Sequence, residues 1–419
     1  MNGNMENSDH SQLMVKFFTK NTKYSIADNP YSIPASSTIQ NLNALIIGIL
    51  KSDDNELETD FSTIEFDFYI NGQYLSSTLD DLIQTISDIK VESVIEIEYA
   101  ERNAAPQPID SIILDDWVSS IKGLNDLILV GCYDNSVQIW NTSGNQLVLL
   151  PGHTGPVKSV AWLNESQVMS SSHDQSILIW HLAPKNKLIK TQKCVGHAES
   201  VECLDISEDR SKFVSGSWDK MIKLWNLLDE SELEENSVSK KKKSDVPTQI
   251  KTPLITLSGH GENVSGCRWM DEKNVCTCSW DHTIRLWDMF SGQESQCLKS
   301  VNKIYVTIDY SRVNGLISAG CNDSLVRIYD PRSTEGNLVK ISLTSHTGWV
   351  SSVCWSKKDQ NLLVTGSYDN TAKLWDIRNP KTSMYDMVGH EDKVLCVDWT
   401  WENLIVSGAA DNTFKMYQA

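Results

Sequence analysis

The sequence lacks the features that mark several common classes of protein. Its 419 residues contain no run of eighteen consecutive apolar residues, which excludes a helix that crosses a membrane. The first twelve residues are polar and carry Glu6 and Asp9, so we expect no secretory signal there. The formal net charge is −18, which argues against wrapping nucleic acid as a primary role, because binding phosphates requires a basic face.

The sequence also lacks any C-x-x-C pair among its ten cysteines. Cys276 and Cys278 are the closest two, and they stand in an apolar strand pattern. We therefore predict reduced, buried thiols in an intracellular protein and no structural zinc site.

Charge and tryptophan divide the chain into two parts. Residues 1–105 contain 17 Asp or Glu against 6 Lys or Arg, a net charge of −11, which leaves −7 for the rest. All 14 tryptophans lie at or beyond Trp117. Since 419 residues are too many for one core, we predict a tail over 1–11, a domain over 12–101, a linker over 102–106 and a second domain over 107–419.

The second domain is built from an internal repeat. Seven aspartates recur at intervals of 40, 45, 62, 42, 46 and 42 residues, and an aromatic residue follows each one six positions later. Short apolar, β-branched runs alternate with Asp, Asn, Ser and Gly between them, which is typical of strands and turns. Five of the six intervals fit the period of a four-stranded propeller blade. The aspartates are Asp134, Asp174, Asp219, Asp281, Asp323, Asp369 and Asp411.

A histidine and a hydroxyl residue accompany five of the aspartates, and the other two units have Val130 and Ala319 at the hydroxyl position. A half-satisfied polar network in a core is less stable than none. We therefore predict a hydrogen-bonded chain from Asp through His and Ser or Thr to the Trp indole. The five sets are His153, Ser170, Asp174 and Trp180; His197, Ser215, Asp219 and Trp225; His260, Thr277, Asp281 and Trp287; His346, Thr365, Asp369 and Trp375; and His390, Ser407 and Asp411.

The repeated histidines have a bearing on catalysis. One active site does not recur five times, so we assign these histidines to packing. No P-loop, nucleophile elbow or metal-ligand cluster is present in the sequence. We predict no catalytic residue, no cofactor and no enzymatic activity.

The repeats carry a family resemblance. Trp287-Asp288 and Trp375-Asp376 match the signature of the WD-repeat propellers, and Trp140-Asn141 and Trp225-Asn226 are softened copies. The chain resembles a seven-bladed member of that family over residues 107–419. Ser111–Leu114 precedes the first blade, and we expect it to supply the outer strand of the last blade, which would close the ring and remove two sheet edges.

One interval between aspartates is about 20 residues too long, and a polar tract accounts for it. Residues 229–251 run from acidic to basic and have almost no apolar residues, so we predict a disordered insertion between blades three and four. Its four-lysine run is either a nuclear import signal or a solvated charged loop. The run is Lys240, Lys241, Lys242 and Lys243.

The first domain has the pattern of a second fold. A strand over 13–19, a helix over 39–50, a strand over 64–70 with an Asn71-Gly72 turn, a short helix over 78–86 and an alternating strand over 93–99 follow one another. This is the order of an α+β ubiquitin-like (β-grasp) domain. The predicted fold class is therefore mainly β, a seven-bladed WD-repeat β-propeller preceded by a ubiquitin-like domain.

This pairing of domains resembles the WD-repeat ribosome-biogenesis factor of the PeBoW complex. The resemblance implies a nuclear, nucleolar and nucleoplasmic protein of the precursor (pre-60S) large subunit, needed for rRNA maturation. In that family the propeller binds a block-of-proliferation-type WD protein, which holds pescadillo. The ubiquitin-like domain offers a carboxylate to the metal site of midasin, an AAA ATPase that removes the factor. Glu92 is the matching position here, although an exposed Glu usually serves only solvation.

The residue before each turn aspartate should point to one end of the propeller, and we call these seven positions the rim. They are Tyr133, His173, Trp218, Trp280, Asn322, Tyr368 and Ala410. Five of them carry rings, which suit contacts with a partner, although they would also suit the wall of a channel mouth.

Two alternatives to a PeBoW-type factor are an eight-bladed Notchless-like pre-60S factor and a substrate receptor of a ubiquitin ligase. Seven aspartates disfavour the first, and the lack of an F-box or cullin-adaptor helix pair disfavours the second.

Overall fold

The computed structural model describes residues 12–53, 64–86, 94–102, 104–183, 187–227, 249–299, 302–333, 339–401 and 403–419. The chain divides into two units, Met1–Ala104 and Ala105–Ala419. No helix in these ranges is long and apolar enough to cross a membrane.

The first unit is a five-stranded sheet with the order β2-β1-β5-β3-β4. β1 (Gln12–Phe18) runs parallel to β5 (Ile95–Glu101), and the other pairs are antiparallel. The remaining strands are β2 (Pro30–Pro34), β3 (Phe66–Ile70) and β4 (Gln73–Tyr74). This order is that of the β-grasp, so the predicted fold class of this unit is confirmed.

Periodic apolar residues build the core of the first unit. Alternate residues of β1, such as Val15 and Phe17, are buried. Helix α1 (Ile39–Asp53) buries Leu42, Ile46 and Leu50, which are four residues apart and so lie on one face. A 3-10 helix (Thr22–Tyr24) and α2 (Leu79–Thr85) complete the unit.

Two local signals in this unit produce the structures that they predict. Asn71 and Gly72 have φ angles of 49° and 75°, which is the left-handed backbone that a tight β3–β4 hairpin needs. At the start of α2, Thr78 and Asp81 exchange side chain–backbone hydrogen bonds in a capping box.

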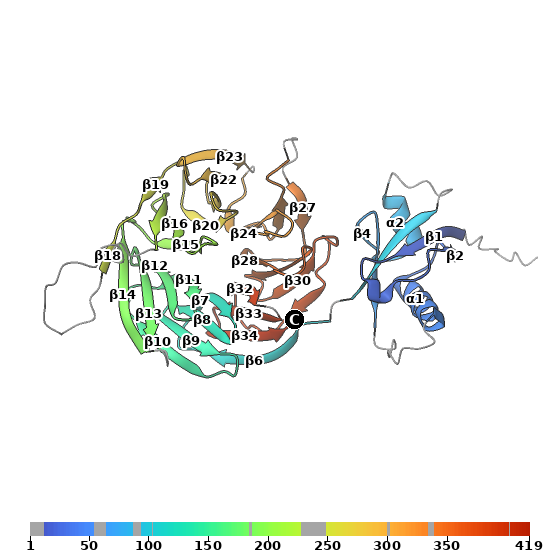
Figure 1. The fold of residues 1–419 in the computed structure, drawn as a ribbon, viewed down its shortest axis with the longest axis horizontal. Coiled ribbons are helices and arrows are strands. Elements are labelled where there is room, and N and C mark those ends of the chain that lie inside the picture. The colour runs from blue at the N-terminus through green and yellow to red at the C-terminus, as the bar shows by residue number, and fades with distance from the viewer. Residues whose placement is uncertain are drawn as a thin grey trace, which may run out of the picture. The chain divides into compact units, whose positions relative to one another are not determined.

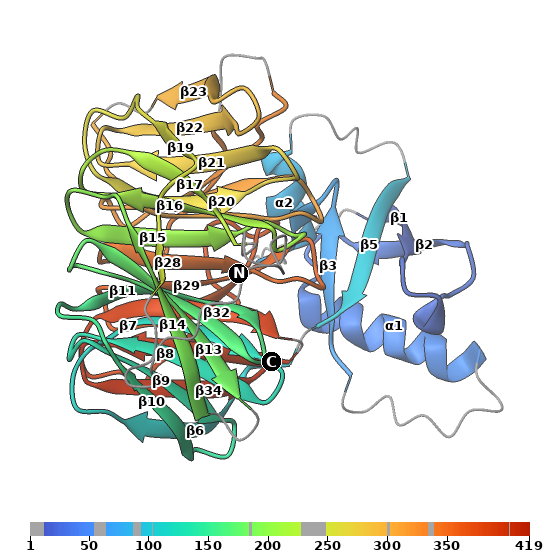
Figure 2. The ribbon, with the colours of Figure 1, turned by 60° about the vertical axis from the view of Figure 1, so that its left-hand side comes forward.

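The second unit contains seven sheets arranged around a centre (Figure 1). The first strands of neighbouring blades lie side by side, and β32 lies beside β7 to complete the ring. Figure 2 shows the propeller from another side, with its strands running across the view one above another. The predicted seven-bladed propeller is confirmed, and the count disagrees with an eight-bladed Notchless-like protein.

The strands of the first four blades are as follows. Blade one has β7 (Val118–Leu124), β8 (Leu127–Cys132), β9 (Ser136–Asn141) and β10 (Gln146–Pro151). Blade two has β11 (Val157–Asn164), β12 (Gln167–Ser172), β13 (Ser176–Ala183), β14 (Lys187–Val195) and β18 (Gln249–Lys251). Blade three has β15 (Val201–Ile206), β16 (Lys212–Ser217), β17 (Ile222–Asn226) and β19 (Ile255–Leu257). Blade four has β20 (Val264–Trp269), β21 (Asn274–Ser279), β22 (Thr283–Asp288) and β23 (Gln293–Lys299).

The last three blades follow the same plan. Blade five has β24 (Tyr305–Tyr310), β25 (Ile317–Cys321), β26 (Val326–Tyr329) and β27 (Val339–Leu343). Blade six has β28 (Val350–Trp355), β29 (Leu362–Ser367), β30 (Ala372–Asp376) and β31 (Tyr385–Met387). Blade seven has β32 (Val394–Trp401), β33 (Leu404–Ala409), β34 (Thr413–Gln418) and β6 (Gln107–Ile113).

Blade seven takes its outer strand from the start of the unit. β6 pairs antiparallel with β34, from Ile113 opposite Thr413 to Gln107 opposite Gln418. The expected closure by strand exchange is confirmed, and the strand begins four residues earlier than Ser111. At the inner side of this junction a Cβ on Gly408 would lie 2.3 Å from Val118 Cγ1, so only glycine lets blades seven and one approach this closely.

The prediction for the insertion needs a correction. Gln249–Lys251, placed in a disordered tract, forms β18 and pairs in parallel with β14 as a fifth strand of blade two. The side-chain amide oxygen of Gln249 accepts hydrogen bonds from Lys190 and Gln192, which secures the pairing. Residues 229–248, including Lys240, Lys241, Lys242 and Lys243, lie outside the described residues.

All ten cysteines are free thiols, and nine of them are buried. Burial raises the pKa of Cys194 and of Cys278 to about 12, so both are protonated thiols at neutral pH. Cys297, on the outer strand β23, is half-buried, and the prediction that every thiol lies in the core is wrong for this one. Its outer-strand position explains the difference, because outer strands have solvent on one edge.

Candidate functional site

The turn aspartates fix the rim of the propeller. In each of the seven turns the residue after the aspartate has a positive φ, from 62° at Asn412 to 71° at Asn135. The residue before the aspartate donates its backbone N–H to the carbonyl of the residue that precedes the first strand of the same blade, as Trp218 does to Ser200 O at 2.9 Å. These bonds hold the backbone of each rim residue in a defined position, so its side chain can be presented without much loss of entropy on binding.

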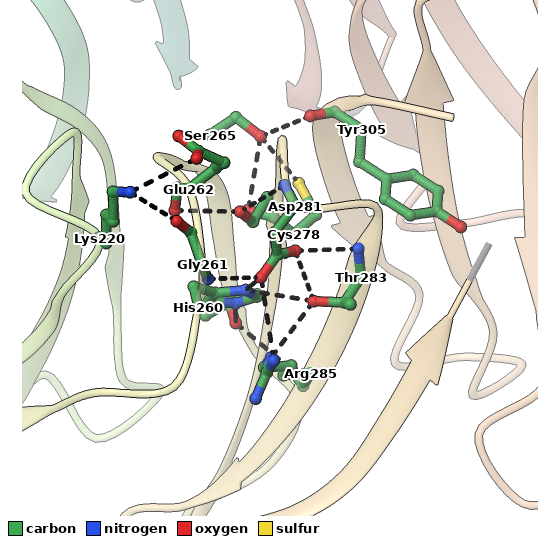
Figure 3. A network of polar contacts seen from close by, with 12 residues as sticks. Lys220, His260, Gly261, Glu262, Ser265, Cys278, Asp281, Thr283, Arg285 and Tyr305 are labelled. Atoms are coloured by element: carbon green, nitrogen blue, oxygen red, sulfur yellow. Dashed lines mark hydrogen bonds and ion pairs between the residues drawn. The ribbon is translucent and has the colours of Figure 1, made fainter. Parts of the chain in front are cut away.

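Hydrogen-bonded chains hold five of these turns. In each, His Nδ1 lies 2.8–2.9 Å from an aspartate oxygen and His Nε2 lies 2.7–2.8 Å from the Ser or Thr oxygen. In four of them the Trp indole donates to the same hydroxyl at 2.8–3.0 Å. Figure 3 shows the contacts around His260 and Asp281, where Thr283 and Arg285 join the network. The structure thus brings together the residues that the spacing grouped.

The charge on the aspartates is strongly favoured. Burial alone would raise the pKa of Asp219, but the hydrogen bond and charge of His197 and two backbone N–H groups outweigh it and lower the pKa to about 2. The pKa values of Asp174, Asp281, Asp369 and Asp411 are lowered in the same way against burial. The turns therefore keep ionised aspartates at neutral pH.

The two blades without the histidine use other partners. In blade one the Trp140 indole donates to Gln138 at 3.1 Å, and Gln138 donates to Ser136 at 3.1 Å. In blade five Arg327 forms two hydrogen bonds with Asp323, at 2.9 and 2.6 Å. The sequence contained a signal for Arg327, because it stands four residues after the turn aspartate.

The rim carries exposed aromatic rings. Trp218, Trp280 and Tyr368 are 45%, 37% and 36% exposed. His173 is exposed and Tyr133 half-buried, whereas Asn322 is half-buried and Ala410 buried. Rings from three successive blades are in contact, with centroids 6.4 Å apart for His173–Trp218 and 6.2 Å for Trp218–Trp280.

Two exposed tryptophans that pack against rim residues were missed by sequence reasoning. Trp117 and Trp349 are 42% and 40% exposed. Trp117 lies 5.3 Å from Tyr133 and Trp349 stacks on Tyr368 at 5.9 Å, measured between centroids. Each stands directly before the buried valine that begins its blade, and this position was the available signal.

Charged residues lie on the inner strands, and the sequence analysis did not find them either. The fifth residue of the first strand in each blade is Lys122, Ala161, Asp205, Arg268, Asp309, Cys354 or Asp398. Arg268 Nε donates to Asp309 at 2.8 Å, and Lys122 Nζ pairs with Asp398. Asp309 also accepts the backbone N–H of Trp355 at 2.8 Å, and Asp398 that of Gly123 at 3.0 Å. These bonds join blade four to five, five to six and seven to one.

The proposed acidic contact, Glu92, lies outside the described residues. The next two glutamates along the chain lie on β5 and have different surroundings. Glu96 is exposed, and Glu98 forms an ion pair with Lys20 at 2.7 Å. Within the described ranges no group of three or more His, Cys, Asp or Glu side chains could hold a metal ion.

Comparison with known proteins places the two units in named families. Residues 13–83 match the NLE (NUC135) domain, and five segments match the WD domain, G-beta repeat. The chain is 42% identical over 405 residues to a ribosome biogenesis protein WDR12 homolog of Ixodes scapularis, which covers 93% of this chain and 94% of that protein. A WDR12 homolog of Nematostella vectensis is 42% identical, covering 94% and 96%. The chain belongs to the WDR12 family of ribosome biogenesis proteins.

In this WDR12-family protein, the segments that match the WD domain are the ones that contain the hydrogen-bonded His networks. The matched segments are 144–181, 187–226, 251–288, 336–376 and 381–418. They hold all five sets of His, Ser or Thr and Asp, whereas Gln138 of blade one and Arg327 of blade five lie outside them. In this chain the matched segments are therefore the ones that carry the histidine network.

Proposed function

We propose that the chain is a non-enzymatic assembly factor of the large (60S) ribosomal subunit. The propeller holds partner proteins in a PeBoW-type complex, needed for maturation of large-subunit rRNA precursors in the nucleolus and nucleoplasm. The partners are a block-of-proliferation-type WD protein and, through it, pescadillo. The acidic ubiquitin-like domain is the handle by which midasin removes the factor from pre-60S particles.

The exposed rim carries this proposal. Trp218, Trp280 and Tyr368 expose more than a third of their surface, on turns that hydrogen-bonded chains hold rigid. Aromatic side chains on a preorganised backbone supply large apolar area at little entropic cost, which suits the centre of a protein interface. A scaffold therefore fits better than an enzyme.

The proposal that the first unit is the handle rests on its charge and on family membership. The first unit carries most of the net negative charge of the chain. A divalent ion with an incomplete shell favours a carboxylate oxygen, so Glu92 can complete the metal site of midasin in trans. Lys240, Lys241, Lys242 and Lys243 serve as the nuclear import signal in this proposal.

Affinity purification of the tagged full chain with mass spectrometry tests the proposal. We expect pescadillo, the block-of-proliferation-type protein and midasin to be recovered. A Trp218→Ala, Trp280→Ala variant should lose the first two and keep midasin. Recovery of a cullin in their place would replace the proposal with a ubiquitin-ligase receptor.

A further inference from the structure

The connection between the two units enters the propeller at its closing strand. Arg102, the last residue after β5, is held by its ion pair with Asp67 at 2.8 Å and by a backbone hydrogen bond to Glu65 at 2.7 Å. Only residues 103–106 separate Arg102 from Gln107, where β6 begins. Four residues span at most about 14 Å, so a pull on the first unit reaches β6 almost directly.

β6 is held by little besides its backbone pairing. Six of its seven residues are exposed, and Ile112 alone is buried. Ile109 and Ile113 are 48% and 78% exposed. One side-chain hydrogen bond, from Lys415 Nζ to Ser111 Oγ at 2.9 Å, adds to the ladder with β34. Removing β6 and Leu114 takes two apolar side chains, Ile112 and Leu114, out of the core that they share with Phe414 and Met416. Unfolding a complete blade uncovers its whole core, which is a larger apolar surface.

The other end of β6 leads to the rim. Ile113 lies opposite Thr413, beside the Asp411 turn, and Leu114 donates its N–H to Asn412 O at 2.8 Å. Three residues later Trp117 contacts the ring of Tyr133, and its carbonyl accepts the Tyr133 N–H at 3.0 Å. The next residue, Val118, is fully buried in the core, so we expect a segment that is pulled off the propeller to end there.

We propose that β6 is a mechanical link between the handle and the rim. A pull on the first unit strips β6 from β34 and withdraws Trp117 from Tyr133 before any blade unfolds. The rim then loses one of its aromatic contacts while the ring is still folded, so force applied to the handle weakens the hold of the rim on a partner. This inference rests on the proposed function for the source of the pull, but its tests use the chain alone.

Single-molecule stretching tests the first step. Handles are attached through azide-bearing residues incorporated at Ala104 and at Lys357, an exposed position in blade six. We expect a first, separate extension of about 38 Å, the contour length of the eleven residues from Gln107 to Trp117. A Ser111→Cys, Lys415→Cys disulfide between these paired positions should shorten that step to the four residues before Ser111, about 14 Å, and a reductant should restore its full length.

The matched control is a Lys223→Cys, Thr256→Cys disulfide in blade three. Lys223 Nζ donates to Thr256 Oγ1 at 2.9 Å in the same register as Lys415 and Ser111, but this pair lies off the pulling path. It should leave the first step unchanged. A first step that keeps its full length with the β6 lock in place, or an extension that only whole-propeller unfolding produces, would overturn the proposal.

Hydrogen exchange tests the coupling to the rim. Ile112→Ala loosens β6 without touching the rim, and we expect the Tyr133 amide to exchange at least about tenfold faster, since its acceptor is Trp117 O. The Tyr368 amide, bonded in the same way to Trp349 O at 2.9 Å, should not change. Equal rates at Tyr133 in both proteins would refute the link. Neither the stretching nor the exchange experiment contains a partner or an ATPase. The purification experiment can therefore fail while these two succeed, and the reverse, so the proposed function and this inference are tested separately.

Discussion

Asp219 Oδ2 lies 2.8 Å from Nδ1 of His197, and the same oxygen accepts the backbone N–H of Ala198 at 3.0 Å. The carboxylate thus holds both the ring and the loop that leads into blade three. Asp219→Ala leaves a buried imidazole without its partner, and we expect the propeller to lose about 1–3 kcal/mol of unfolding free energy. Urea denaturation followed by tryptophan fluorescence measures this loss.

The control for that substitution is Asp134→Ala in blade one. Asp134 is exposed and accepts the backbone N–H of Ser136 at 2.8 Å, with no histidine in its blade. We expect a change below about 1 kcal/mol there. Equal losses at Asp134 and Asp219 would show that the turn and not the histidine network carries the stability.

Acid should destabilise the propeller through the same groups. A carboxylate with a depressed pKa in the folded state contributes stability above its unfolded pKa and loses it as pH falls through its folded pKa. For Asp219 this window runs from about 4 in the unfolded chain to about 2 in the folded one. Burial also lowers the pKa of His390, so its neutral form is favoured and acidification below about 6.5 acts in the same direction.

We therefore expect the melting temperature to fall on acidification below neutral pH, and most steeply between about pH 4 and 2. Asp219→Asn should show a shallower fall than the parent chain, by on the order of 1 kcal/mol after allowance for solvent screening. Calorimetry across this range measures both. Parallel pH profiles for the two proteins would contradict the assignment.

Glu92→Ala should leave assembly of the complex intact and block release, because the first unit would no longer supply an oxygen to the metal site. Sedimentation of pre-60S particles after ATP addition measures release. Glu96→Ala, which removes an exposed carboxylate on β5, is the control and should be released normally. Normal release of the Glu92→Ala chain would mean that another acidic residue is the handle.

Removing the rim rings should weaken binding of the partner without affecting the fold. We expect Trp218→Ala, Trp280→Ala to reduce affinity for the block-of-proliferation-type protein by at least about 30-fold, the effect of losing about 2 kcal/mol at a hot spot. Calorimetric titration measures it. Phe290→Ala removes a ring that is 70% exposed at the opposite ends of the blade-four strands, and unaltered affinity is expected.

The Lys122–Asp398 pair should be needed for closure of the ring. Burial opposes the charge of Lys122, but Asp398 outweighs it and raises the pKa of that lysine. Asp398→Ala removes this support and the acceptor of the Gly123 N–H, and we expect a loss of about 2 kcal/mol or more. Chemical denaturation measures it. Asp209→Ala, in an exposed turn of blade three, should cost less than about 1 kcal/mol.

The sequence by itself determined the repeat and its chemistry. Asp219 and its counterparts, the histidines upstream and the hydroxyls between them recur at fixed spacing, and a buried polar network requires all of its members together. Alternation and helical spacing likewise predicted the β-grasp, because burial in β1 and α1 follows periods of two and of three to four residues. Local patterns of this kind can be predicted from a single sequence, because the residues that form them are close together along the chain.

Tertiary structure decided what depends on residues far apart in the chain. Asp309 meets Arg268 and the backbone of Trp355 because the first strands of three successive blades pack side by side, and no spacing within one blade encodes that meeting. Gln249–Lys251 became a strand because β14 had a free edge to pair with, although its composition resembles a loop. Trp117 likewise contacts Tyr133 only in the folded blade, because the turn that carries Tyr133 packs against the residue just before the first strand.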